Sequence, residues 1–156
     1  TRLEFLWGKQ VPYIVITLIT FIILLVVIKF LFHIPFRGSF SALIVGTVLY
    51  IITSTGIGLL ISTFTRTQIA SLVAAFALTL VPSFEFSGLI SPASSLVGGA
   101  EVFSRIFPAR YFVNISVGTF TKAIGFTELA WNFVFLLVAY ITIQTLTVLL
   151  LKKQEI

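Results

Sequence analysis

Cysteine and aspartate are absent from this sequence of 156 residues, and histidine occurs once. Without cysteine, the chain can form no disulfide, no thiolate metal site and no cysteine nucleophile. The sequence also contains no G-x-x-x-x-G-K-[ST] phosphate loop, no G-x-S-x-G elbow and no H-E-x-x-H pair. We therefore expect no catalytic residue, no metal centre, no cofactor and no ATP binding of the Walker kind.

Charge is scarce as well. Charged residues make up 10% of the chain, against about 25% in soluble domains. Four stretches carry no charge at all, namely 11–28, 38–65, 67–84 and 129–151. The shortest have 18 residues and would span about 27 Å as helices, close to the hydrocarbon core of a bilayer. With 58% hydrophobic residues and a mean hydropathy of +1.16, the chain is predicted to be an integral membrane protein.

The first ten residues, TRLEFLWGKQ, mix charged and apolar side chains. Leu3, Leu6 and Trp7 fall at helical spacing, which is typical of a short helix on the membrane surface. Pro12 is tolerated in the first turn of a helix, so we expect it to open the first span, 11–32. Lys29 would extend from this span toward the headgroups.

The second and third spans, 40–65 and 67–90, are separated only by Thr65-Arg66-Thr67-Gln68. Small residues recur along each span at a spacing of four: Ser54, Gly58 and Ser62 in the second, Ala70 and Ala74 in the third. Small side chains let helices approach closely in lipid. We predict a tight antiparallel hairpin in which these ladders face each other.

Region 91–127 is apolar but broken by glycine, proline and arginine, and no piece of it is long enough to cross the bilayer. Short re-entrant or interfacial helices are expected there, covered by protein or water. The last span is 128–151. The predicted fold class is all-α, a polytopic transmembrane bundle of four spanning helices with short helices before the last span.

The net charge of +5 comes from single basic residues at the span ends, which indicates anchoring at lipid headgroups rather than binding of nucleic acid. An even number of spans places both ends on one side of the membrane. Each side then carries five lysines and arginines, so the positive-inside rule does not choose an orientation.

Glu85 and Gln144 are the most informative polar residues of the spans. Glu85, between Phe84 and Phe86, lies at a span end and could face a substrate path, because charges inside a membrane are costly. It could equally be solvated or paired with Arg105 or Arg110. Gln144 lies deep in the last span, where it could line a cavity, although a hydrogen bond between helices is the favoured interpretation.

The blocks LEFLWGKQVPY, GLLISTFTRTQIA, SGLISPASSL, FPARYF and GTFTKAIGF occur in an order that resembles the permease subunit of type-2 ABC exporters. The similarity is greatest to the bacterial inner-membrane permeases associated with multidrug export. These permeases have six spans, and the resemblance implies that this chain corresponds to the last four, with an N-terminal part missing. Val117 departs from the family pattern, in which an arginine often precedes the glycine at this position.

The resemblance implies partners and roles. Residues 1–10 would form the end of a coupling helix that docks on an ABC ATP-binding subunit, separate or fused, through Arg2, Glu4, Phe5 and Lys9. Both ends would then be cytoplasmic, and region 91–127 extracytoplasmic. A second permease half, identical or homologous, would complete a path through which an amphiphilic substrate moves by alternating access.

Two other classes of protein are open to test. A secondary transporter or channel would need ionisable groups within the membrane, and the spans offer little apart from Glu85. An intramembrane enzyme would need a cluster of histidine, aspartate, cysteine or serine residues, which one histidine without aspartate or cysteine does not favour.

Overall fold

The computed structural model describes residues 2–87 and 98–151. The elements are α1 (Arg2–Phe30), α2 (Phe40–Phe64), α3 (Gln68–Ala75), the π-helical segment η1 (Phe76–Leu80), α4 (Val81–Phe86), α5 (Gly99–Ile106), α6 (Pro108–Phe120) and α7 (Ala130–Leu151). These described residues contain no strand. Four helical segments are long and apolar enough to cross a membrane, at Glu4–Phe30, Phe40–Phe64, Gln68–Phe86 and Ala130–Leu150. The predicted all-α polytopic bundle is confirmed.

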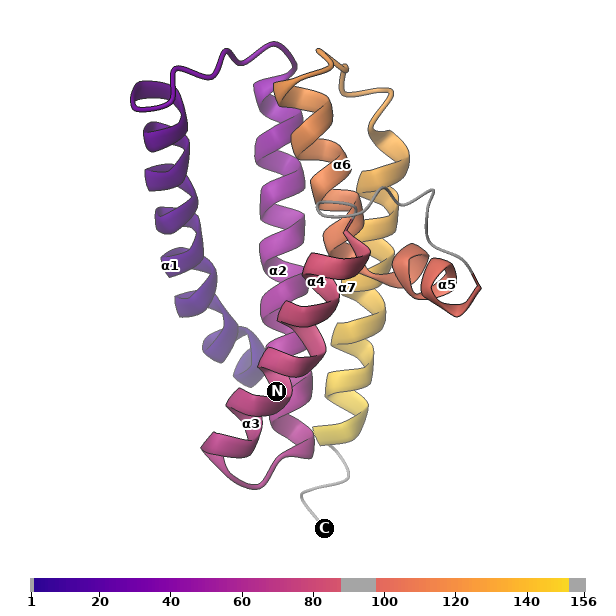
Figure 1. Cartoon of the computed structure of the whole chain (residues 1–156). Helices are drawn as coiled ribbons and strands as arrows, with labels where there is room; N and C mark the ends of the chain where they lie inside the picture. Colours follow the sequence, from indigo (N-terminus) through magenta and orange to yellow (C-terminus); the bar gives the residue numbers. More distant parts are fainter. Residues whose placement is uncertain (1, 88–97, 152–156) are drawn as a thin grey trace.

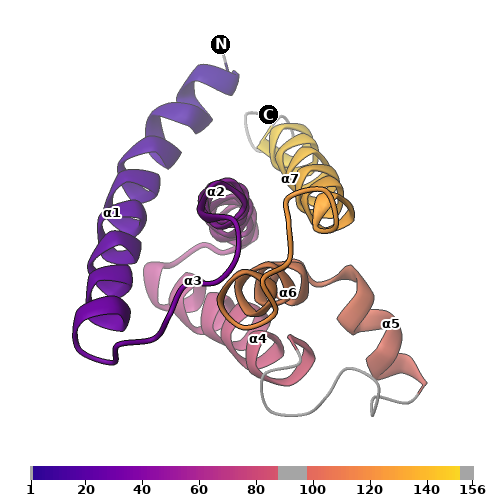
Figure 2. The same cartoon turned by 90° about the horizontal axis from the view of Figure 1, so that it is seen from above.

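The centre of the bundle is α2, which lies between α1 and α7, with α6 beside α2 and α7 (Figure 2). The buried core joins Ala42 of α2, Ile115 of α6, Leu129 just before α7, and Phe133 and Leu136 within α7. Gly46 permits this packing, because a Cβ atom there would lie 2.9 Å from two side-chain carbons of Ile115. Figure 1 shows the N-terminal end of α1, the α2–α3 turn and the C-terminal end of α7 at one end of the bundle.

The residues expected to form a surface helix, 1–10, are described from Arg2 onward and belong to the same helix as the first span. α1 continues without a break from Arg2 to Phe30, and Pro12 lies inside it. A proline inside a helix lacks an N–H donor and crowds the carbonyl group four residues earlier, so local sequence favours a break here. Tertiary contacts outweigh that preference: Leu6 is buried, and the ring of Trp7 lies 6.4 Å from that of Tyr140 on α7.

The predicted third span is one helical path, Gln68–Phe86, with a π-helical turn in the middle. Thr67 caps its start, because the side-chain oxygen accepts a hydrogen bond from the Ala70 amide. At the π turn, the amide of Val81 donates to the carbonyl of Phe76, five residues earlier. Such wide turns occur where the ordinary helical ladder is interrupted, and Pro82 follows directly.

Two short helices precede the last span, as expected. α5 has 8 residues and α6 has 13, so neither is long enough to cross a membrane. α6 packs against α2 and α7 and buries Ile115, Gly118 and Thr119. The amide of Gly38 donates to the carbonyl of Thr119 at 2.8 Å, which ties the loop before α2 to the end of α6.

Candidate functional site

A buried pair of amide side chains connects α1, α2 and α7. Gln10 is fully buried, and its Nε2 donates to the Ile52 carbonyl at 2.8 Å and to Thr55 Oγ1 at 2.9 Å. Nε2 of Gln144 donates to Gln10 Oε1 at 3.4 Å. Gly56 allows this approach, because a Cβ atom there would lie 3.3 Å from a side-chain carbon of Ile143. A polar group buried in an apolar bundle needs such partners, so this contact fixes α1 against the other two helices.

Gln144 thus makes the hydrogen bond between helices that the sequence favoured. Its Oε1 atom is buried and has no hydrogen-bond partner among the described residues. Gln10 was not identified from the sequence. The signal was present, because Gln10 continues the stripe of Leu6 and Trp7 at helical spacing.

Two hollows follow one another between α1 and α2. The first, of about 470 Å³, is partly polar and is lined by Lys9, Gln10, Tyr13, Thr17, Thr55, Gly58, Leu59 and Ser62. The second, of about 410 Å³, is almost wholly apolar and is lined by Leu18, Phe21, Ile22, Leu25, Val26, Lys29, Phe30, Phe40, Ile44, Thr47 and Val48. In Figure 1, α1 and α2 diverge from the end that holds the N-terminus toward the opposite end.

The small-residue ladder of α2 lies partly beside α1. Gly58 and Ser62 line the hollow between α1 and α2. A Cβ atom at Gly58 would meet nothing within 4 Å, so no neighbour packs closely there. Of the facing ladder, Ala70 is exposed and Ala74 is half-buried, as is Ser54 of α2. The close helix contacts of α2 occur instead at Gly46 and Gly56.

The residues predicted for a substrate path lie apart. Glu85 and Phe84 are exposed on α4, and the ring of Phe86 stacks on Phe103 of α5 at 6.3 Å. Gln144 contacts Gln10 of α1, so the structure does not bring it together with Glu85. The two arginines have other partners: Arg105 pairs with Glu101 at 2.6 Å, and Arg110 donates to Ser104 Oγ at 2.9 Å.

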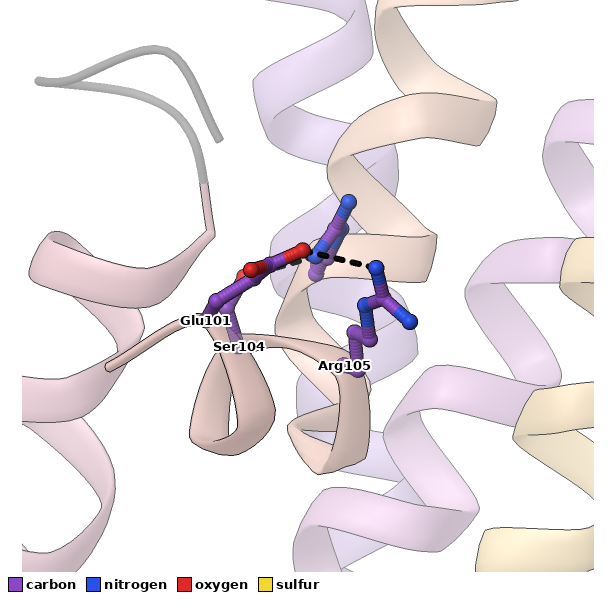
Figure 3. A network of polar contacts seen from close by, with 4 residues as sticks. Glu101, Ser104 and Arg105 are labelled. Carbon is purple, nitrogen blue, oxygen red and sulfur yellow. Dashed lines mark hydrogen bonds and ion pairs between the residues drawn. The ribbon is translucent and has the colours of Figure 1, made fainter. Parts of the chain in front are cut away.

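Ser104 joins the short helices to α4. This fully buried residue donates from its Oγ to the Phe86 carbonyl at 2.9 Å and accepts from Arg110. Figure 3 shows it beside the ion pair of Glu101 and Arg105. The hydroxyl of Tyr111 donates to the Arg105 carbonyl. Partial burial raises the pKa of Tyr111 above its ordinary value of 10.0, against the opposing effect of the arginine charges, so this phenol remains a donor at neutral pH.

The residues predicted to dock on an ATPase lie at the N-terminal end of α1. Glu4 is exposed, and Phe5 is 56% exposed. The Nζ atom of Lys9 lies 4.6 Å from the centre of the Phe5 ring, and the same side chain lines the first hollow. The side chain of Arg2 lies outside the part of the chain that the structure describes.

Comparisons with known proteins agree with the resemblance seen in the sequence. The model of the family described as "ABC-2 family transporter protein" matches residues 1–150. The chain is 31% identical over 154 residues to the probable multidrug ABC transporter permease YbhS of Escherichia coli K12, covering 99% of this chain and 41% of that protein. It is 28% identical over 125 residues to the probable permease YbhR of the same strain, covering 80% of this chain and 33% of that protein.

The chain therefore spans about two fifths of the length of YbhS, and the match covers nearly all of this chain. No solved structure matches it significantly. The family match over residues 1–150 and the four helices of spanning length lead to one conclusion. The chain belongs to the ABC-2 transporter family and forms a multi-pass membrane protein.

Proposed function

We propose that this chain is the four-span portion of the permease subunit of an ATP-driven ABC exporter in the bacterial inner membrane. It would move an amphiphilic substrate, such as a drug or lipid-like molecule, by alternating access. The family match over residues 1–150 carries the proposal. The relatives' names as multidrug ABC transporter permeases support the substrate class.

The proposal includes a second permease half, identical or homologous. Within the most apolar part of α1, and within that of Gln68–Phe86, no side chain is buried. These faces need cover from lipid or from other helices, since apolar surface is not left in water. An extended path between two halves would use part of this surface, and membrane lipids would cover the rest.

The energy source would be an ABC ATP-binding subunit, because the sequence contains no phosphate loop of its own. Arg2, Glu4, Phe5 and Lys9 at the N-terminal end of α1 are the proposed docking residues. The continuous helix from Glu4 to Gln10 supports coupling, because Gln10 connects α1 to α2 and α7 less than two turns away from Glu4. A displacement at this end would reach the centre of the bundle through these contacts.

Reversal of one charge tests the docking surface. In the intact permease, Glu4→Lys should lower both substrate-stimulated ATP hydrolysis and export when the ATPase is co-expressed, because docking depends on matched charge. Membrane abundance should remain near that of the parent. A lysine that only anchored the helix at anionic lipid would be neutral or helpful.

Glu128→Lys is the matched control, since Glu128 is an exposed glutamate two residues before α7, and α7 begins at the end of the bundle opposite the N-terminal end of α1 (Figure 1). Phe5→Ala should reproduce the defect of Glu4→Lys without a change of charge. Normal hydrolysis and export in both variants, at normal abundance, would remove the docking assignment.

A further inference from the structure

The crevice between α1 and α2 changes from polar to apolar along its length. The hollow near the N-terminal end holds a lysine and several hydroxyl groups, whereas the next hollow is lined almost entirely by aliphatic and aromatic side chains. We propose that this crevice is a binding site for a phospholipid with an anionic headgroup, whose head lies at Lys9 and whose acyl chains lie along α1. The inference does not depend on ATP-driven transport.

The charge of the first hollow favours an anionic occupant. Lys9 is the one charged residue in its lining, so no carboxylate neutralises the ammonium group within the hollow. The hydroxyl of Tyr13 adds a second donor on the same helix. A phosphate group next to a lysine gains a charge-assisted interaction that a zwitterionic or apolar head does not gain to the same extent.

The lengths fit a lipid in one leaflet. Lys9 and Leu18 are nine residues apart on α1, which is about 14 Å along a helix and about half of the hydrocarbon thickness. A lipid of one leaflet with its headgroup at Lys9 therefore extends its acyl chains past Tyr13 and Thr17 and reaches the start of the second hollow at Leu18. Leu18, Phe21 and Ile22 offer dispersion contacts to the chain ends there, whereas Lys29 lies 11 residues beyond Leu18 on α1.

No side chain from position 58 of α2 fills the first hollow. Gly58 contributes no side chain to it, and a Cβ atom at this position would meet nothing within 4 Å. The hollow is partly open to the surroundings of the bundle, so a lipid can enter it from the membrane. Replacement of Gly58 by a residue with a large side chain would therefore fill the hollow without disturbing a packed contact.

Lipid retention tests the charge of the site. The intact permease would be purified in detergent, depleted of lipid and incubated with equal amounts of phosphatidylglycerol and phosphatidylcholine of identical acyl chains. Native mass spectrometry then counts the bound lipids. The parent should retain phosphatidylglycerol preferentially, and Lys9→Gln should lower this preference about fivefold, the effect of one lysine near anionic lipid.

Arg66→Gln is the matched control, because Arg66 is an exposed cation outside the crevice, in the α2–α3 turn at the same end of the bundle as the start of α1 (Figure 1). It should leave the preference unchanged. Equal retention of the two lipids by the parent, or an equal loss in Arg66→Gln and Lys9→Gln, would overturn the proposal in favour of bulk lipid around the protein.

Gly58→Leu tests the shape of the site. The added side chain should lower retention of both lipids, while the melting temperature of the lipid-depleted protein remains that of the parent. Unchanged retention in Gly58→Leu would contradict the proposal, and so would loss of a protein dimer in place of lipid. If the variant is too poorly produced to measure, the comparison of Lys9→Gln with Arg66→Gln decides.

Discussion

At the scale of single residues, buried amides and glycines determine how closely the helices approach. Gln144 could be assigned a hydrogen bond between helices from the sequence, because an amide deep in an apolar span needs a partner. Its partner Gln10 lies on the helical stripe of Leu6 and Trp7, but the sequence does not reveal which of several polar residues meets Gln144 in space. The same limit applies to Gly58, where a small residue lines a hollow instead of a helix contact.

The two glutamines should differ in their contribution to stability. Gln10 makes two hydrogen bonds to α2 and accepts one from α7, whereas Gln144 makes only the last and leaves its Oε1 unpaired. Gln10→Leu should therefore lower the free energy of unfolding by about 1–2 kcal/mol. Gln144→Leu should cost about 0.6 kcal/mol, the mean for polar contacts between membrane helices. Unfolding in mixed micelles measures both values, and a larger loss for Gln144→Leu would contradict the arrangement.

Two glycines of α2 provide an internal comparison. A methyl group at Gly46 would lie 2.9 Å from Ile115, so Gly46→Ala should lower stability by about 1–3 kcal/mol through overpacking. Gly58→Ala adds a methyl group in open space, so it should be neutral or stabilise the helix by up to about 1 kcal/mol. Thermal unfolding in detergent compares the two variants. Equal damage from both would mean that α3 packs on Gly58, as the sequence had suggested.

At the scale of elements, the four spans and the turn at Arg66 follow from the sequence, because long uncharged runs have few alternatives to a transmembrane helix. The course of α1 does not follow from it. Pro12 locally favours a break, whereas Leu6, Trp7 and Gln10 on its N-terminal side pack against or bond to the rest of the bundle. The π-helical turn before Pro82 is likewise a local adjustment that hydropathy does not encode.

The position of α5 should depend on Ser104. Ser104→Ala removes the hydroxyl that donates to the Phe86 carbonyl and accepts from Arg110. The carbonyl and the guanidinium group then each lose a hydrogen-bond partner. We expect faster amide hydrogen exchange in α5 and at the start of α6, with no change in α7. Ser116→Ala, on α6, is the control. Unchanged exchange in α5 after Ser104→Ala would show that other contacts hold the short helices.

At the scale of the whole molecule, the sequence indicates four spans but leaves the orientation open, because five basic residues fall on each side. The resemblance to exporter permeases supplies the orientation as a hypothesis. The structure adds that the α2–α3 turn and the end of α6 lie at opposite ends of the bundle (Figure 1).

Single cysteines can determine the orientation, because the chain has none of its own. We expect Thr121→Cys to react with a membrane-impermeant maleimide from outside intact cells, whereas Thr67→Cys should react only after permeabilisation. Both positions are exposed, so accessibility within the protein does not separate them. Labelling of Thr67→Cys in intact cells would reverse the orientation and place the proposed docking surface outside.

The measurement that tests the proposed function most directly is transport in inside-out membrane vesicles that hold the intact permease and its ATP-binding subunit. We predict that an amphiphilic fluorescent dye accumulates only when ATP is present and the ATPase is catalytically competent, and that a protonophore does not abolish accumulation. Dye accumulation that needs no ATPase and collapses with the protonophore would contradict the account, because it would identify a secondary transporter.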